Sequence, residues 1–212
     1  YELLETFHDG TSYIQPKILD AGTNAEPGQP FLPTVSTFYA VEPGKKFLVQ
    51  TMIEQTETIE NVDILPFDTW ENTPAGTIQE GAIYQQNQLF PQSIATISDP
   101  IIFRDITMVQ VSITPFQYNP ATKTLIAIQE MEIQLVENGN TEVMPFIPEK
   151  RSREFETLYE SLIVNYNSLS RDNIEYQRPS ILYVLPNNIG NLFGTVEQLM
   201  DWKKRVGYDV HF

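Results

Sequence analysis

The sequence predicts a mainly β protein. We expect an antiparallel, jelly-roll-like β-sandwich over residues 1–170 that ends in a helix, and a β-α-β segment over residues 180–212. Up to residue 149, apolar residues alternate in short runs separated by prolines, which is typical of antiparallel strands. After Pro148 the spacing becomes helical, and polar residues 171–179 predict a linker before the last segment.

The clearest strands lie near a predicted turn. In "ITMVQVSITPF", residues 106–116, Val109, Val111 and Ile113 share one face. The stretch "FQYNPATKTLIAIQEMEIQL", residues 116–135, is interpreted as the returning half of a hairpin, with the reversal between Asn119 and Lys123. The apolar phase of the returning strand slips near Gln129, which predicts a β-bulge there.

Two other segments of the first 149 residues predict a turn and a long loop. "FYAVEPGKKFLVQTMI" places a turn at Pro43 and Gly44 between two β-rich runs. Residues 68–87, "DTWENTPAGTIQEGAIYQQN", show no convincing period, so we expect a long loop of the kind that often carries function.

The predicted closing helix is "SREFETLYESLIVNYNSL", whose apolar residues recur at spacings of three and four. Ser152 is the expected N-cap, and Glu154 and Glu156 complement the positive end of the helix dipole.

The last segment reads as strand, helix and strand, and therefore as the opening of a parallel sheet. "SILYVLP" is a continuous apolar run typical of a strand buried on both faces. Thr195 and Gln198 predict a capping box, Gly207 the end of the helix, and Trp202 a packing role within it. Because this segment is too short to cover both faces of its sheet, we expect the chain to stop at the start of a second domain.

Composition excludes several classes of function. A formal charge of −15 argues against nucleic acid. Between Phe47 and Phe103 there is no Lys, Arg or His, but there are eight carboxylates. This stretch is a solvated acidic surface or, alternatively, a cation site or a surface for a basic partner.

No apolar run approaches the roughly 20 residues of a membrane span. The first residues lack the pattern of a signal peptide, so we expect that any export signal has already been removed.

Metal and catalytic sites are not evident. With no cysteine and two histidines, neither a thiolate nor a histidine metal cluster is expected, and we predict no cofactor while leaving a calcium ion open. Glu130 and Glu132 lie two apart on a strand and are interpreted as a solvated sheet surface rather than a glycosidase pair. Trp70, in the long loop, is either a binding anchor or a residue that pins the loop.

A longer match is more specific than these patterns. "LFPQSIATISDPIIFRDITMVQVSITPFQYNPATKTL" resembles a prosegment of the gingipain family of cysteine peptidases, and "GQPFLPTVSTFYAVEPG" is similar to that prosegment's opening. "FETLYESLIVNY" resembles its closing helix. "ILYVLPNN" through "DWKKRVGYDV" resembles the first strand, helix and second strand of the caspase-like peptidase domain, so the resemblance covers nearly the whole chain.

The resemblance implies a prosegment that assists folding of its own catalytic domain and blocks the active-site cleft until it is cleaved off. The protein would be secreted or lie at the surface of a bacterium. The catalytic histidine and cysteine would lie beyond Phe212, so no catalytic residue is expected in this chain. Activation cleavage is expected after Arg171, with Arg178 as the alternative.

The resemblance also implies an inhibitory loop, which would be "PFDTWENTPAGTIQE" with Asp68, Trp70, Glu71 and Asn72. In arginine-specific members a basic side chain of this loop enters the specificity pocket, and this chain offers none there. Either the cognate enzyme accepts acidic or neutral residues, or the loop covers the cleft without entering the pocket.

Two functions of other classes stay open. One is a carbohydrate-binding or adhesive β-sandwich module, which would leave the trailing β-α-β segment without a purpose. The other is a non-catalytic homologue used in secretion or assembly.

Overall fold

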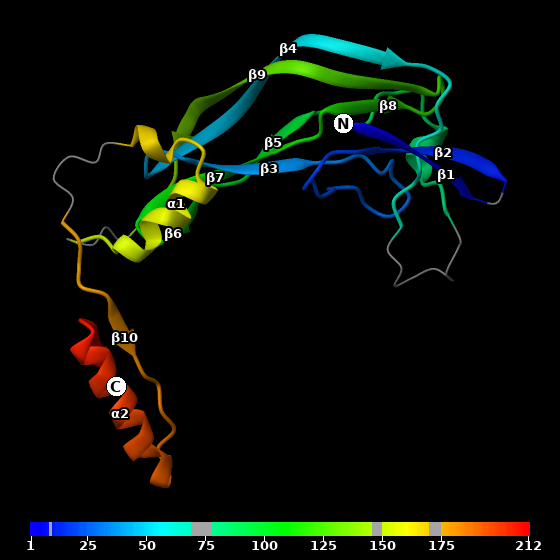
Figure 1. Cartoon of the computed structure of the whole chain (residues 1–212). Helices are drawn as coiled ribbons and strands as arrows, with labels where there is room; N and C mark the ends of the chain where they lie inside the picture. The colour runs from blue at the N-terminus through cyan, green and yellow to red at the C-terminus, as the bar shows by residue number, and fades with distance from the viewer. Residues whose placement is uncertain (9, 69–77, 146–149, 170–174) are drawn as a thin grey trace. The chain divides into compact units, whose positions relative to one another are not determined.

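The computed structural model describes residues 1–8, 10–68, 78–145, 150–169 and 175–212. The chain forms two compact units, Tyr1–Pro145 and Phe146–Phe212, and each is described by itself. The fold is mainly β with antiparallel sheets in the first unit, as predicted (Figure 1). The expected domain boundaries at residues 170 and 180 stay predictions.

The first large sheet is organised around one central strand. This strand, β7, pairs antiparallel with three others and is buried along most of its length, with Val109 and Val111 fully buried as the alternation predicted. The four strands are β3 (Val35–Ala40), β5 (Ala95–Ile97), β6 (Ile101–Phe103) and β7 (Ile106–Ile113).

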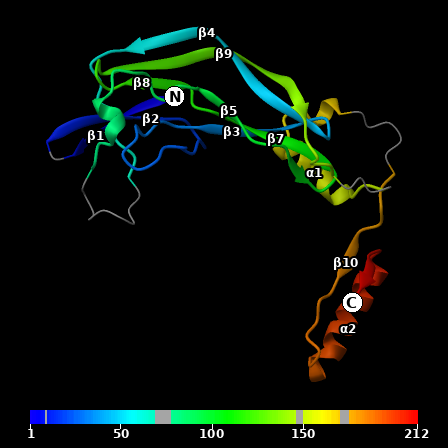
Figure 2. The ribbon, with the colours of Figure 1, turned by 180° about the vertical axis from the view of Figure 1, so that it is seen from behind.

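The second large sheet is a long ribbon with one short strand added. Its members are β4 (Lys45–Ile59), β8 (Phe116–Asn119) and β9 (Thr124–Asn140), in the order β4-β9-β8. Figures 1 and 2 show β4 and β9 running side by side over their whole length. A third sheet of the first unit is the hairpin of β1 (Glu2–His8) with β2 (Thr11–Lys17).

The predicted turn is confirmed, but one predicted pairing is wrong. Phe116–Asn119 pairs with Thr124–Ala127 around a turn in which the Asn119 side-chain oxygen accepts from the Ala121 N–H at 3.1 Å. The run Ile106–Ile113, however, pairs within the other sheet. Pro115 explains this, because it cannot donate to a ladder and the chain crosses from one sheet to the other there.

The predicted bulge is confirmed. Opposite β4, the partners step from Glu130 directly to Ile128, which leaves Gln129 as the extra residue. Its side-chain amide donates to the Glu57 carboxylate on the opposite strand at 2.8 Å. The bulge lets buried Ile128 and half-buried Met131 follow the same side of the sheet despite the slip in phase.

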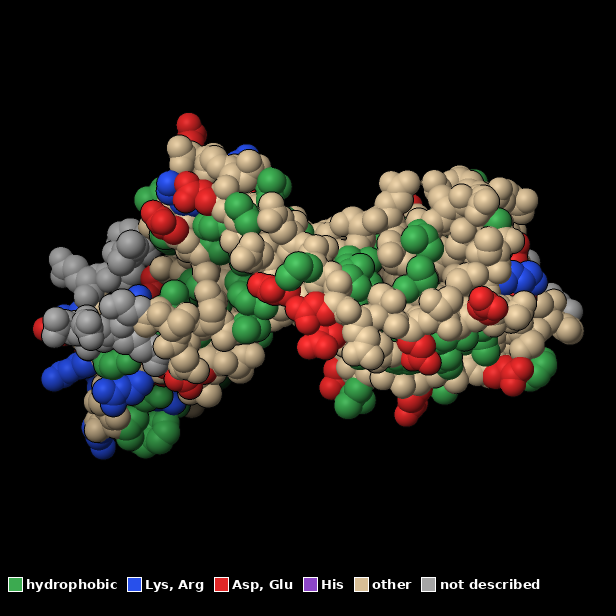
Figure 3. All heavy atoms as spheres, turned by 90° about the horizontal axis from the view of Figure 1, so that it is seen from above, with side chains coloured by type: hydrophobic (Ala, Val, Ile, Leu, Met, Phe, Trp, Pro, Cys, Tyr) green, Lys and Arg blue, Asp and Glu red, His purple; other side chains and the backbone are tan. Residues whose placement is uncertain are grey.

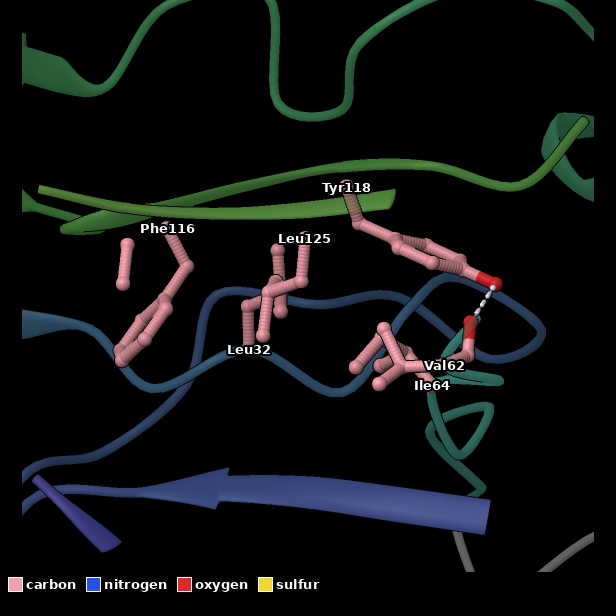
Figure 4. Packing of buried hydrophobic residues seen from close by; sticks show 7 residues of the cluster. Leu32, Val62, Ile64, Phe116, Tyr118 and Leu125 are labelled. Atoms are coloured by element: carbon pink, nitrogen blue, oxygen red, sulfur yellow. Dashed lines mark hydrogen bonds between the residues drawn. The ribbon is translucent and has the colours of Figure 1, made fainter. Parts of the chain in front are cut away.

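A cluster of seven buried residues joins the β8–β9 hairpin to two irregular segments. Figure 4 shows these side chains and the Tyr118 hydroxyl, which donates to the Val62 carbonyl at 3.1 Å. Burial raises the pKa of Tyr118 to about 12. The cluster consists of Leu32, Val62, Ile64, Phe116, Tyr118, Leu125 and Ala127.

The second unit begins with the predicted closing helix, which is shorter than expected. It consists of η2 (Arg153–Phe155), α1 (Glu156–Leu162) and η3 (Tyr166–Ser168). Ser152 precedes η2, but its hydroxyl donates to the Glu154 carboxylate at 2.8 Å and makes no capping bond to the helix backbone. The prediction of Ser152 as a side-chain N-cap is therefore wrong.

The predicted β-α-β segment is confirmed. The strands β10 (Ser180–Leu182) and β11 (Asp209–His211) pair in parallel, and η4 (Gly190–Leu192) and α2 (Phe193–Arg205) lie between them in sequence.

Three details of that segment were predicted with mixed success. Gly207, at φ +100°, follows the helix as expected. The capping box is wrong, because α2 begins before Thr195 and has no side-chain cap. Trp202 is 53% exposed rather than packed. Within the residues described above, no helix is both long and apolar enough to cross a membrane.

We predict that Leu125→Ala lowers the free energy of unfolding by about 2–5 kcal/mol, because Leu125 is fully buried in the cluster and its loss leaves a cavity. Urea titration followed by circular dichroism measures this. The matched control is Leu19→Ala, at 85% exposure, which should change stability by no more than about 0.5 kcal/mol. Equal effects at the two positions would contradict this location of the core.

Candidate functional site

The candidate inhibitory loop leaves the core at Phe67 and returns at Gly81. Residues 69–77 lie outside the part of the chain that the structure describes, so the site is built from the residues at the two ends of the loop. Of the predicted loop residues, Asp68 is half-buried beside Phe67. Trp70, Glu71 and Asn72 lie outside the described residues.

Both ends of the loop are bonded to one glycine. The Gly28 N–H donates to the Phe67 carbonyl at 2.8 Å, and the Gly28 carbonyl accepts from the Gly81 N–H at 2.8 Å. One buried residue, Gly28, therefore holds the start and the end of the loop together. We call this arrangement of Gly28, Phe67 and Gly81 the loop neck.

The neck requires glycine at two positions. Gly28 has φ +83°, and a Cβ on it would lie 3.0 Å from the Gly81 backbone nitrogen and Cα. A Cβ on Gly81 would lie 2.8 Å from the Gly28 oxygen. Because the opposing atoms belong to the backbone, neither contact can be relieved by a side-chain rotation.

A local turn sets the conformation of Gly28. The Gln29 N–H donates to the Glu26 carbonyl at 2.9 Å, with Pro27 and Gly28 as the central residues. Proline at the second position and a positive-φ glycine at the third are the requirements of a type II turn. The Glu26 N–H also donates to the Gln29 side-chain Oε1 at 2.9 Å.

On the side where the loop begins, further backbone hydrogen bonds extend the neck. The Phe67 N–H donates to the Gln29 carbonyl at 2.7 Å, and the Phe31 N–H donates to the Leu65 carbonyl at 2.8 Å. The rings of Phe31 and Phe67 pack edge to face with centroids 5.1 Å apart. The bonded segment continues into Ile64, which is fully buried in the core cluster.

The returning side of the neck is fixed by Tyr84 in η1 (Ala82–Gln85). Its hydroxyl donates to the Ile64 carbonyl at 2.7 Å, and its ring lies 6.3 Å from that of Tyr118. Burial raises the pKa of Tyr84, which favours the neutral hydroxyl that donates this hydrogen bond. Ile64 and Tyr84 thus link both ends of the loop to the same core.

Sequence reasoning identified the loop but missed the neck. The available signal was "EPGQ", the type II turn at residues 26–29, which carries no sign that its glycine meets residues 67 and 81. Such a long-range contact is visible only when the chain has folded.

Part of the acidic stretch lies on the long ribbon, where Glu54 and Glu57 of β4 are exposed. In Figure 3, seen from the side of β4 and β9, carboxylates are spread over this ribbon with few basic side chains. Glu130 and Glu132 are exposed, as expected for a solvated surface. In the described ranges, no three His, Asp or Glu side chains are grouped so as to hold a metal ion, and the question of a calcium ion stays open.

The candidate activation segment is described on one side only. Arg171 lies outside the described residues, and Arg178 is exposed. Between them, Glu175–Gln177 lies beside Arg151. The Arg151 N–H donates to the Glu175 carbonyl at 2.9 Å, and the Gln177 N–H donates to the Arg151 carbonyl at 2.8 Å.

Comparison with known families gives a match over residues 5–174 to the model described as Propeptide_C25. The chain belongs to this propeptide family. The match ends within the segment expected to be the activation linker, residues 171–179.

Curated relatives agree with the family. The chain is 28% identical over 191 residues to gingipain R2 of Porphyromonas gingivalis, a match covering 86% of the chain and 25% of that protein. It is 28% identical over 187 residues to gingipain R1 of the same organism, covering 86% of the chain and 19% of that protein. The chain thus spans a quarter or less of the length of these relatives.

Solved structures agree with the fold. The chain matches a structure of the complex of the pro- and mature domains of P. gingivalis RgpB with a TM-score of 0.66 and 26% identity, over 79% of this chain and 87% of that chain. A structure on the zymogenic latency of gingipain K from the same organism matches with a TM-score of 0.52 and 19% identity, over 65% and 81% of the two chains. The second likeness shows the fold alone.

We predict that Gly28→Ala destabilises the chain by about 1–3 kcal/mol, because alanine is strained at this φ and its methyl group meets the Gly81 backbone. The same variant should expose the loop to limited proteolysis between residues 67 and 81. Urea titration and a protease time course measure the two effects.

Gly22→Ala is the matched control. No heavy atom beyond its own chain neighbours lies within 4 Å of the added Cβ, and its φ is outside the left-handed region. We expect a change of at most about 0.5 kcal/mol and no new cleavage. A Gly28→Ala chain as stable and as protease-resistant as the Gly22→Ala chain would show that the neck does not hold the loop.

Proposed function

We propose that the chain is the prosegment, with the first β-α-β of the catalytic domain, of a secreted or cell-surface bacterial cysteine endopeptidase similar to the gingipains. The prosegment assists folding of its catalytic domain and blocks the active-site cleft until activation cleavage releases it. The partner is that catalytic domain, which continues beyond Phe212. The family match over residues 5–174 is the observation that carries this proposal.

The loop neck supports the inhibitory part of the proposal. A protein segment that occupies a peptidase cleft must resist being bound as an ordinary flexible substrate. Fixing both ends of a loop to one buried glycine lowers the conformational entropy lost when the loop docks. The same neck makes the loop base a poor substrate, because its backbone donors and acceptors are already bonded to Gly28 and Gln29.

The charge of the prosegment supports a basic partner surface. The stretch from Phe47 to Phe103 has no basic residue, and the exposed ribbon carries carboxylates. Complementary charge on the catalytic domain would speed association and make it sensitive to salt.

Two modes of inhibition follow from the acidic loop. In one, the specificity pocket accepts an acidic or neutral side chain, and of the two carboxylates Glu71 is the better candidate because Asp68 is half-buried at the neck. In the other, the loop covers the cleft and no side chain enters the pocket. An acidic side chain in a pocket with an acidic floor would be strongly unfavourable, so the first mode requires a neutral or basic pocket.

Inhibition of the separately expressed catalytic domain by the prosegment tests the proposal and separates the modes. If a carboxylate enters the pocket, Asp68→Ala or Glu71→Ala should cost about 2–4 kcal/mol of binding, on the order of 30- to 1000-fold in the inhibition constant. If the loop acts by covering the cleft, both variants should inhibit like the parent.

Glu60→Ala is the matched control, because it removes an exposed carboxylate from the same acidic stretch outside the loop. Its inhibition constant should stay within about threefold of the parent value. A parent chain that fails to inhibit the catalytic domain at micromolar concentration would refute the proposed inhibitory function.

A further inference from the structure

In the second unit, two short segments that flank the expected cleavage site in sequence contact each other. One arm is Lys150–Arg153 and the other is Glu175–Gln177. The two arms run in parallel and are joined by the two backbone hydrogen bonds of Arg151. We call this contact the strap.

Side chains add to the backbone pairing. The Lys150 ammonium lies 3.2 Å from the Glu175 carboxylate, and the Arg153 guanidinium lies 4.8 Å from the centroid of the Tyr176 ring. The first arm carries three basic residues within four positions, in a chain whose net charge is −15. This arm is therefore suited to bind an extended peptide that carries an acidic and an aromatic residue.

The first arm is continuous with a folded element. It leads directly into η2 and α1, where the Tyr166 hydroxyl donates to the buried Glu156 carboxylate at 2.8 Å. The rings of Tyr159 and Tyr166 lie 5.3 Å apart, and both residues are buried. Lys150–Arg153 therefore runs directly into the closing helix of the prosegment.

The position of Arg171 between the arms has a mechanistic consequence. Cleavage after Arg171 leaves Lys150–Arg153 on the prosegment and Glu175–Gln177 on the new N-terminal segment of the catalytic domain. This cut leaves the two backbone hydrogen bonds, the ion pair and the ring contact between the arms intact. Cleavage after Arg178, in contrast, leaves both arms on the prosegment.

We propose that the strap is a retention site: after the first cut, Lys150–Arg153 binds residues 175–177 of the newly formed N-terminus and slows release of the cleaved prosegment. This inference rests on the proposed function. Its partner is a defined segment of the same precursor, and release becomes fast once a cut after Arg178 separates that segment from the enzyme.

Release of the nicked prosegment from the full precursor tests the proposal. The catalytic cysteine is replaced by alanine, and a site for a sequence-specific protease replaces residues 170–174, so that one cut is made outside the strap. The combined variant Tyr176→Ala, Gln177→Pro removes the ring contact and one N–H donor. We expect it to dissociate on the order of 10- to 100-fold faster than the nicked parent, measured by dilution of a fluorescently labelled prosegment.

Two controls isolate the strap. Tyr208→Ala removes a ring that lies 5.0 Å from the Lys203 ammonium, the same kind of contact made wholly on the catalytic-domain side, and should release at the parent rate. In precursors cut after residue 178 instead, the strap substitutions should have no effect on release.

A charge exchange, Lys150→Glu with Glu175→Lys, is a second test that avoids the local disturbance a proline at position 177 would cause. Each single change should speed release about two- to fivefold, and the pair should restore it.

The outcomes separate this proposal from the proposed function. If the strap variants and the nicked parent release at the same rate while the parent prosegment still inhibits the active enzyme, the retention site is refuted and the proposed function stands. If the parent prosegment does not inhibit at all, the proposed function fails whatever the release rates are.

Discussion

The peptide units around Gly28 are the constraint on which the candidate site depends. A type II turn gives Gly28 a positive φ, and this conformation lets its N–H and carbonyl reach Phe67 and Gly81. The two loop ends in turn meet the core at Ile64, through the irregular segment that precedes Phe67 and through the Tyr84 hydroxyl. Loop, turn and core therefore form one unit, and a methyl group at Gly28 would disturb all three.

Much of the fold followed from local patterns. Asn119 and Pro120 placed a turn, the slip of apolar phase placed a bulge at Gln129, and a continuous apolar run before an amphipathic helix placed the parallel pair β10 and β11. These features depend on neighbours in sequence. The pairing of β7 did not follow, because the choice between two sheets is a long-range one that depends on the chain crossing at Pro115.

The site was predicted less completely than the fold. The lack of period in residues 68–87 indicated a functional loop, and the family resemblance gave it an inhibitory role, but neither indicated that residues 67 and 81 meet at Gly28. The capping box at Thr195 failed for a related reason. Its residues fit the pattern, yet α2 begins earlier, at Phe193, where the chain continues from a 3₁₀ turn.

Amide hydrogen exchange of the free chain tests most directly whether the neck exists before the catalytic domain binds. The account predicts that the N–H groups of Gly28, Phe67 and Gly81 exchange as slowly as those of the buried β8–β9 hairpin, because they are bonded to one another's segments and linked to the same core. If these three amides exchange at the rate of an unstructured peptide in the free chain, the loop is not preformed and the account is contradicted.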